Sequence, residues 1–281
     1  MNTLNLAGIK ISDINKVELL QEIESLIVNK KNAYVVTPYS MFVVKAQKDI
    51  EFKNILNQAD ISTADGIGIT LGIKYFSLKG VYLPMLKCLT AMLFNPSYFK
   101  GTIKEKLSGS EFIYDVCELA VDQNYKVFML GGLDFGNGNT GDLAKQKLLL
   151  KYPKLEIVGT YAGTPDIKED QEIVEIINSS NAQILLIAYG PIQQEKWIYR
   201  NQFNLKPMVS ICLGGTFDYV SGEKKKVSKG LSDKGFEGLL RPLISEKGNI
   251  KLMLSRMKKA WLGIIVFIFA LIQIKRNTQE D

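Results

Sequence analysis

The chain of 281 residues contains no histidine. Histidine is the side chain whose ordinary pKa lies closest to neutral, so proton transfer near pH 7 must fall to a carboxylate, a lysine, a tyrosine, a thiol or the substrate. Cysteine is also scarce: Cys88, Cys117 and Cys212 are far apart, and no CxxC pair occurs. This pattern argues against a zinc site and suits a reducing cytosol, where each thiol is most simply a small core residue.

The sequence also lacks an Asp-x-Asp motif. Paired carboxylates of that kind hold Mg²⁺ or Mn²⁺ beside a nucleotide diphosphate, so we expect no such metal site and no cofactor. A diphosphate leaving group would then be neutralised by arginine, lysine or helix ends, and the C-terminal segment contains Arg241 and Arg256. Residues 1–16 carry no apolar signal core, so we expect a protein that is not secreted.

Charge is distributed unevenly along the chain, whose net charge is +6. Residues 223–281 contain 13 Lys/Arg and 6 Asp/Glu, a net of +7, whereas residues 1–222 contain 22 and 23, a net of −1. The basic tail indicates an anionic partner, such as a membrane surface or a phosphate group. The aromatic and basic residues do not follow the pattern of a nucleic-acid-binding module, so we expect no nucleic-acid partner.

Short apolar segments alternate with amphipathic ones along residues 33–213. The pattern predicts strands at 33–37, 61–64, 126–130, 155–158, 183–188 and 208–213. It predicts helices at 38–57, 110–123, 140–151, 168–180 and 193–204, the first of them capped by Thr37 with Pro38 in its first turn. We therefore expect an α/β fold: a Rossmann-like, mostly parallel sheet with helices on both faces in residues 1–222, and a helical, basic, membrane-associating appendage in residues 223–281.

Two apolar segments interrupt this alternation. Residues 81–99 contain one charge, Lys87, and form either a buried helix in a long connection or an interfacial helix pressed against lipid. Residues 260–272 are 13 consecutive apolar residues, about 20 Å of helix, which is short for a hydrocarbon core of ~30 Å. With Trp261 and flanking basic residues this segment favours a membrane-surface anchor over a span; a core helix packed on the sheet is the alternative.

The most informative short segment is residues 61–68, in which Asp65 follows a short strand and precedes Gly66. Working groups of α/β proteins commonly lie just beyond the carboxyl ends of strands, so Asp65 is a candidate for proton transfer, although it could instead cap the following turn. Gln194 and Glu195 open a helix after another strand, where an amide could bind a uracil edge or sugar hydroxyls. Asp218 follows the last strand and could hold a ribose or cap a turn.

Gly136, Gly138 and Gly141 match the dinucleotide fingerprint G-x-G-x-x-G literally. The match is weak, because several residues separate Gly136 from the preceding strand and no well-placed acidic residue follows. Three interpretations stay open: an NAD-dependent oxidoreductase, a backbone that approaches a phosphate at the start of the helix at Thr140, and a flexible turn.

Together, the segments from about Tyr34 to Arg241 resemble the WecG/TagA/CpsF glycosyltransferase family. The resemblance rests on the order and spacing of Thr37-Pro38, ADGIG at 64–68, VFMLGG at 127–132, IVG at 157–159 with Gly163, QEKW at 194–197, GGTFD at 214–218 with Gly222, and GFE at 235–237 with Leu240-Arg241. It implies an inverting, metal-independent enzyme that moves an N-acetylmannosamine-type sugar from a UDP-sugar to a polyprenyl-diphosphate-linked acceptor in bacterial cell-surface polysaccharide synthesis. It also implies a peripheral position on the inner, cytoplasmic face of an anionic membrane; a homo-oligomer is compatible with the sequence.

The resemblance implies roles for individual residues. Asp65 matches the catalytic base, Thr37 the polar residue beside it, and Gln194 an active-site glutamine. We expect substrate-binding roles for Gly66, Lys106, Gly131, Gly132, Glu195, Gly215, Asp218, Arg241 and Arg256.

The chain departs from the family pattern at several of these positions. Tyr39 stands where asparagine is common, Lys106 replaces an arginine, and Lys226-Val227-Ser228 replaces Arg-Ala-Pro. A lysine keeps the charge but loses bidentate phosphate binding. The connection over residues 65–109 is also longer than usual. These departures leave a second hypothesis open: a membrane-attached, nucleotide-binding scaffold for polysaccharide assembly without transferase activity.

Overall fold

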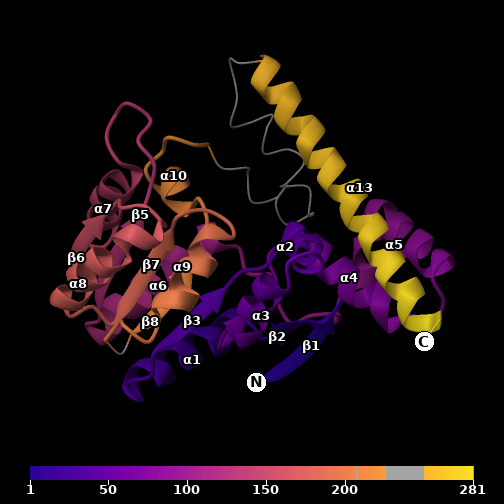
Figure 1. The fold of residues 1–281 in the computed structure, drawn as a ribbon, viewed down its shortest axis with the longest axis horizontal. Helices are drawn as coiled ribbons and strands as arrows, with labels where there is room; N and C mark the ends of the chain where they lie inside the picture. Colours follow the sequence, from indigo (N-terminus) through magenta and orange to yellow (C-terminus); the bar gives the residue numbers. More distant parts are fainter. Residues whose placement is uncertain (207, 226–249, 281) are drawn as a thin grey trace.

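The computed structural model describes residues 1–206, 208–225 and 250–280 of the chain (Figure 1). The centre of the fold is a six-stranded sheet in which all neighbouring strands are parallel, in the order β4 (Ile61–Ser62), β3 (Ala33–Val36), β8 (Val209–Cys212), β7 (Ile184–Ala188), β5 (Lys126–Gly131) and β6 (Glu156–Tyr161). This arrangement confirms the predicted α/β fold with a parallel sheet.

Helices cover both faces of this sheet because its strands are apolar on both sides. Val127 and Met129 of β5 pack in one buried cluster, and Phe128 and Leu130 pack in the other. The first cluster is completed by α1 (Lys16–Val28), α6 (Gly109–Gln123), α7 (Thr140–Lys151) and α10 (Thr216–Val220). The second is completed by α3 (Ile50–Gln58), α8 (Asp170–Ser180), which follows the short 3₁₀ turn η2 (Ile167–Glu169), and α9 (Gln193–Asn201).

The helix predicted at 38–57 is wrong in its extent. The structure divides it into α2 (Ser40–Ala46) and α3, because the Asp49 side chain accepts a hydrogen bond from the Phe52 N–H at 3.0 Å and so starts a new helix. The predicted cap at Thr37-Pro38 is also wrong, since Tyr39 is the residue that precedes α2. Thr37 instead remains at the end of β3, where its hydroxyl donates to the Cys212 carbonyl at 3.4 Å.

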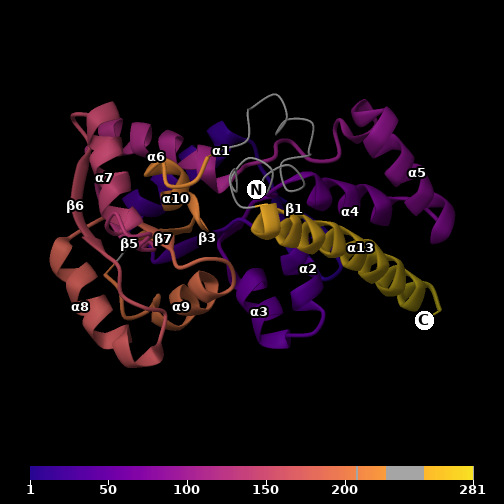
Figure 2. The ribbon, with the colours of Figure 1, turned by 90° about the horizontal axis from the view of Figure 1, so that it is seen from above.

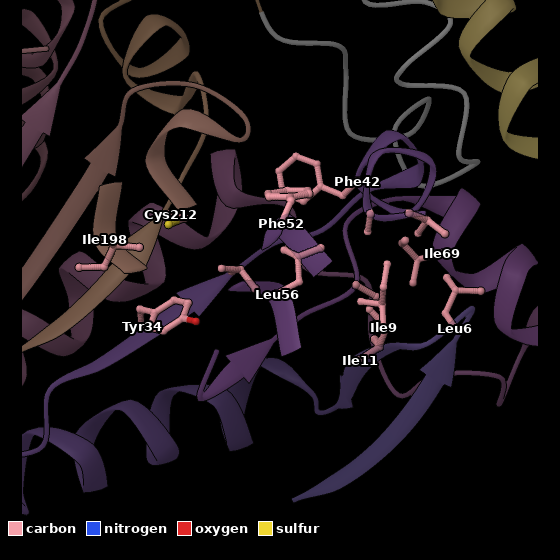
Figure 3. Packing of buried hydrophobic residues seen from close by; sticks show 14 of the residues in the cluster. Leu6, Ile9, Ile11, Tyr34, Phe42, Phe52, Leu56, Ile69, Ile198 and Cys212 are labelled. Atoms are coloured by element: carbon pink, nitrogen blue, oxygen red, sulfur yellow. The ribbon is translucent and has the colours of Figure 1, made fainter. Parts of the chain in front are cut away.

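An N-terminal hairpin, which the sequence pattern did not reveal, supports the edge of the sheet. It consists of β1 (Asn2–Leu6) and β2 (Ile9–Asp13), which pair antiparallel. Figure 3 shows Leu6, Ile9 and Ile11 gathered beside Ile69, a buried residue of α4 (Ile67–Ser77). The Ser62 N–H of β4 donates to the Ser12 hydroxyl at 3.0 Å, so the hairpin is hydrogen-bonded to the shortest strand of the sheet.

The C-terminal helix α13 (Ile250–Glu280) lies against α2 and α4, in the part of the molecule that also holds α5 (Tyr82–Phe94) and the 3₁₀ turn η1 (Pro96–Phe99) (Figures 1 and 2). Phe267 and Leu271 of α13 are buried. Gly68 and Gly72 of α4 face this helix: an added Cβ would lie in ordinary contact, 3.5 Å from Phe267 and 3.6 Å from Leu271 respectively. The space at these two positions is instead limited by Ser40 at the start of α2, which a Cβ on Gly68 would meet, and by Leu6 of β1, which would lie 2.7 Å from a Cβ on Gly72.

Lys275 fastens the far end of α13 to α4. Its ammonium donates to the carbonyls of Tyr75 and Leu78, each at 2.6 Å, and so satisfies groups that the end of α4 leaves unpaired. The Lys275 residue is 4% exposed, and this burial lowers the pKa of its ammonium. The negative end of the α4 dipole offsets part of the cost of burying the charge.

The tail is longer than its apolar run predicted. Met253–Gln279 form 27 residues of helix with a mean hydropathy of 1.8. By length and composition, this helix would suffice to cross a membrane. Length and composition do not distinguish a span from a docked helix, and here the face with Phe267, Leu271 and Lys275 is docked. The opposite face exposes Trp261, Leu262, Ile265, Val266 and Phe269. The predicted domain boundary at residue 222 stays a prediction, and residues 226–249, with Arg241, lie outside the described residues.

Leu271→Ala removes a fully buried side chain from the contact between α13 and α4. Such a substitution typically costs about 2–5 kcal/mol, so urea denaturation of the full chain should show a free energy of unfolding lower by ~2 kcal/mol or more. The matched control is Phe269→Ala, since Phe269 is 67% exposed on the same helix, and its effect should stay within about 0.5 kcal/mol. Equal effects of the two substitutions would contradict the docked position of α13.

Candidate active site

The proposed site residues gather where the parallel strands end. Thr37 follows β3, Asp65 follows β4, Gly215 follows β8, and Gln194 lies in the first turn of α9 after β7. Parallel strands all end at the same edge of a sheet, so these loops are neighbours in space although they are far apart in sequence.

The loop with Asp65 is fixed against the loop with Thr37 by backbone hydrogen bonds. The Asp65 N–H donates to the Pro38 carbonyl at 3.0 Å, and the Thr63 N–H donates to the Val36 carbonyl at 2.9 Å. Both Thr37 and Asp65 are half-buried. The two side chains that the sequence assigned to one catalytic group are therefore carried by adjacent, mutually bonded loops.

Gly66 allows the chain to turn from Asp65 directly into α4. Its φ is +84°, in the region that favours glycine, and an added Cβ would meet nothing within 4 Å. The backbone angle, rather than lack of space, therefore requires glycine here. The Leu107 N–H donates to the Ala64 carbonyl at 2.9 Å, which brings the segment with the exposed Lys106 beside the Asp65 loop.

Glu195 and Gln194 connect the loops after β7 and β8. Glu195 is completely buried; one of its carboxylate oxygens accepts from the Ile192 N–H at 2.5 Å and the other from the Gln194 side-chain amide at 2.6 Å. The Gln194 amide oxygen accepts from the Gly214 N–H at 2.9 Å. One continuous chain of hydrogen bonds therefore runs from the turn before α9 to the glycine pair after β8.

Two features of this hydrogen-bonded connection cost folding free energy. Burial raises the pKa of the Glu195 carboxyl to about 7, although its two hydrogen bonds favour the ionised form. Ile192 has a φ of +73°, a strained angle for a β-branched residue, and its N–H is held by Glu195. Sequence reasoning missed Ile192, because no residue type in the segment signals a left-handed turn at that position.

Asp218 joins the loops after β5 and β8 in a similar way. It is 3% exposed, and its carboxylate accepts from the Thr140 hydroxyl at 3.1 Å and pairs with the Lys224 ammonium at 2.5 Å. The Thr140 hydroxyl in turn accepts from the Leu133 N–H at 2.9 Å. Sequence reasoning missed Lys224 as the partner of Asp218; the signal was a lysine six positions after a carboxylate that has to be neutralised when buried.

The glycines near β5 serve close backbone packing. A Cβ on Gly131 would lie 2.7 Å from the Ala188 carbonyl carbon, and one on Gly132 would lie 2.7 Å from the Gly141 nitrogen. These two glycines therefore allow the end of β5 to pass between β7 and the start of α7. Their place beside the loops of the strand-end edge agrees with the sequence expectation, and their contact with a nucleotide stays a prediction.

The dinucleotide interpretation does not fit this geometry. β5 ends at Gly131, whereas Gly136 and Gly138 lie on an exposed loop five and seven residues later, with open space around their Cβ positions. The start of α7 is capped by Asn139, whose side chain accepts from the Gly141 N–H at 2.7 Å, and the Asp218 carboxylate lies beside Thr140. The Asp218 carboxylate there is paired with the Lys224 ammonium, and the approach of a phosphate at Thr140 stays a prediction.

Of the two arginines predicted to bind the diphosphate, the structure describes one. Among the described residues, no group of three or more His, Cys, Asp or Glu side chains could hold a metal ion. Arg256 lies on the exposed surface of α13, and Arg241 lies outside the described residues. The structure thus brings together Thr37, Asp65, Lys106, Gln194 and Gly215 at one end of the edge, and Gly131, Gly132 and Asp218 further along it.

Comparisons with known proteins identify the family of this chain. A family model described as "Glycosyl transferase WecG/TagA/CpsF family" matches residues 4–84 and 90–280. A protein of Staphylococcus aureus (strain MRSA252), named N-acetylglucosaminyldiphosphoundecaprenol N-acetyl-beta-D-mannosaminyltransferase, is 22% identical over 281 residues, covering 99% of this chain and 95% of its own length. The protein of the same name from strain NCTC 8325 / PS 47 is 20% identical over 279 residues, covering 99% and 95%.

The names of these relatives describe transferases, which does not favour the scaffold hypothesis, and the family excludes the oxidoreductase interpretation. The family model covers nearly the whole chain, including the loops that carry Thr37, Asp65 and Gln194. The resemblance inferred from the motifs is confirmed: the chain belongs to the WecG/TagA/CpsF family of glycosyltransferases.

Proposed function

We propose that the protein is an inverting glycosyltransferase that moves an N-acetylmannosamine-type sugar from a UDP-sugar to a sugar on a polyprenyl diphosphate. The relatives' name specifies an N-acetylglucosaminyl-diphosphoundecaprenol acceptor and an N-acetyl-β-D-mannosaminyl group, and both carry over to this chain as part of the proposal. The product would enter a bacterial cell-surface polysaccharide such as teichoic acid or capsule. The reaction would take place at the cytoplasmic face of the membrane.

The observation that carries the proposal is the position of Asp65, half-buried on a loop that is hydrogen-bonded to the Thr37 loop at the strand-end edge. In the proposed step, the Asp65 carboxylate takes the proton from an acceptor hydroxyl while that oxygen forms a bond to the anomeric carbon. The bond from the anomeric carbon to the diphosphate breaks, and UDP leaves with the electron pair. Thr37 would orient the attacking hydroxyl.

Cationic side chains would neutralise the departing diphosphate. Lys106 is exposed beside the Asp65 loop, and Arg241 and Arg256 belong to the basic appendage. A positive charge aimed at the leaving oxygens stabilises the charge that develops as the bond breaks. A lysine acts there as a point charge without the paired hydrogen bonds of an arginine.

Gln194 and Glu195 would act as positioning residues rather than by proton transfer. The Gln194 oxygen holds the Gly214 N–H, and Glu195 holds both the Gln194 amide and the strained Ile192 turn. Glu195 is fully buried, so it would reach a substrate only through these neighbours. The pair would fix the loops against which the donor nucleotide is placed, and Gly215 lies on one of these loops.

The outward face of α13 supports a position on the membrane surface. Trp261, Leu262 and Phe269 are exposed on this face, and Lys258 and Lys259 precede them. Tryptophan beside lysine is typical of helices that lie at the boundary between headgroups and acyl chains. Such a contact would bring the enzyme to an acceptor that is itself held in the bilayer.

Asp65→Asn keeps the shape of the side chain but removes the proposed base. The rate of sugar transfer, measured as UDP release with a lipid-diphosphate acceptor, should fall roughly a hundredfold or more, because general-base catalysis contributes about 10²–10⁴-fold. Binding of UDP, measured by calorimetry, should be largely unchanged. Asp122→Asn on the exposed surface of α6 is the matched control and should retain wild-type turnover. An Asp65→Asn enzyme with normal turnover would remove Asp65 from the mechanism.

Glu195→Gln should change how stability depends on pH. In the folded protein the pKa of Glu195 is about 7, above its ordinary 4.5, so the folded state holds the proton more tightly than the unfolded state. The free energy of unfolding should therefore fall as pH rises from about 4.5 to 7, by up to ~3 kcal/mol. Urea denaturation between pH 5 and 8 should show a flatter profile for Glu195→Gln, whereas the exposed control Glu22→Gln should keep the wild-type slope. Parallel profiles for all three proteins would contradict the buried, proton-holding carboxyl.

Tryptophan fluorescence should report the membrane contact of α13. The chain has two tryptophans: Trp197 is fully buried in the sheet domain, and Trp261 is 54% exposed on α13. Vesicles with brominated acyl chains and 30% phosphatidylglycerol should quench the emission of Trp261, and the quenching should weaken in high salt because surface charge attraction is screened. Trp261→Phe should abolish the quenching. Undiminished quenching in that variant, or none in the wild type, would contradict the contact.

A further inference from the structure

Helix α5 is largely apolar, with one charged residue, Lys87, and only one of its faces is covered. Met85 and Cys88 are buried against the rest of the protein. The opposite face exposes Tyr82, Leu83, Leu86, Leu93 and Phe94, with Leu83 80% and Phe94 85% exposed. A helix that is largely hydrophobic is normally buried in a core or in lipid. We propose that this outward face of α5 binds the surface of an anionic phospholipid membrane, as a second contact beside α13.

The charge around α5 matches an anionic surface. Residues 67–104, which contain α4, α5 and η1, include five lysines and no aspartate or glutamate, and of these lysines Lys104 is paired with Glu18. Two of these lysines lie over an aromatic ring: the ammonium groups of Lys74 and Lys87 are 4.9 and 5.3 Å from the centroid of Tyr98. Exposed leucine and phenylalanine with lysine and tyrosine at the margin are typical of segments that enter the headgroup region.

The position of α5 places its exposed face in the same part of the molecule as the exposed face of α13. Helix α4 lies between the two: it packs against α5, and its C-terminal carbonyls bind Lys275 of α13 (Figure 2). Among the described residues, α5 and α13 together contribute 11 of the 20 large hydrophobic side chains that are exposed. An exposed apolar area of this kind, bordered by polar residues, marks an interaction site rather than ordinary surface.

Part of α5 lies outside the family match. The family model matches residues 4–84 and 90–280, and the interruption at 85–89 falls inside α5. Leu86 and Lys87 of the exposed face lie in this interruption. A second copy of the chain is a poorer occupant than lipid, because a symmetric contact would bring Lys74 and Lys87 toward their counterparts, and residues 67–104 contain no carboxylate of their own to pair with them.

The membrane contact of α5 would serve the proposed sugar transfer, and its biological role rests on that proposed function. Helix α4 begins directly after Asp65 and Gly66 and has 11 residues, which is about 16 Å of helix. Helix α4 therefore connects the proposed base to the part of the molecule in which α5 would meet the membrane that holds the acceptor lipid.

The test compares two double variants of the full chain in co-sedimentation with vesicles of phosphatidylcholine with 30% phosphatidylglycerol. Leu83→Glu with Phe94→Glu places two carboxylates on the outward face of α5. Leu150→Glu with Phe203→Glu is the matched control, since these side chains are 79% and 83% exposed elsewhere on the sheet domain. Because the substitutions replace two large apolar side chains of the lipid contact with carboxylates, the α5 variant should bind these vesicles at least ~10-fold more weakly than the wild type, and the control within about twofold. Equal binding by the two variants would overturn the proposal.

Two further measurements separate this proposal from its alternatives. Sugar transfer to a water-soluble acceptor with a short alkyl chain should proceed at the wild-type rate in the α5 variant, while transfer to a vesicle-bound acceptor should fall. A wild type that is inactive with every acceptor would refute the proposed function and leave the vesicle result standing.

Sedimentation equilibrium tests whether a second copy of the chain covers α5. A wild-type dimer that the α5 variant abolishes, together with unchanged vesicle binding, would show that a second copy covers α5 and would overturn the lipid assignment.

Discussion

The parallel pairing of β4, β3, β8 and β7 is the constraint on which the rest of the structure depends. It brings four loops from distant parts of the chain to one edge, and hydrogen bonds between backbone groups and buried side chains then fix each loop to the next. Asp65 is bonded to the Thr37 loop, and Gln194 to the Gly214 loop. The site is therefore assembled by the sheet, and the polar side chains keep the loops in register.

A second set of contacts joins this edge to the C-terminal helix. Gly66 turns the chain from Asp65 into α4, and the face of α4 with Gly68 and Gly72 lies against Phe267 and Leu271 of α13. Lys275 closes the contact at the other end of α4. The helix that follows the proposed base is thus also the helix on which the appendage rests, so a membrane contact of α13 or α5 would be held at a fixed position relative to the site.

Much of the fold could be predicted from the sequence, because strands that are buried on both sides appear as short apolar runs and helices as amphipathic ones. The boundaries of α7 and the end of β7 were predicted to the residue. The hairpin at residues 2–13 was missed, since five-residue strands give a weak pattern, and the break at Asp49 was missed because propensity continued through it. Long-range partners were beyond reach: no local signal joins Asp218 to Thr140 or Lys275 to the end of α4. The left-handed turn at Ile192 was missed because no residue type there favours a positive φ.

The absence of histidine made a carboxylate at a strand end conspicuous, and the family supplies the reaction class in which such a carboxylate would serve. The most direct test of this account is UDP release by the wild-type protein from UDP-N-acetylmannosamine, with N-acetylglucosaminyl-diphosphoryl polyprenol in vesicles as the acceptor and a metal chelator present. The account predicts UDP release that depends on the acceptor, persists in the chelator, and is matched by a β-linked disaccharide product. Acceptor-independent UDP release, or no release with any UDP-sugar, would contradict it.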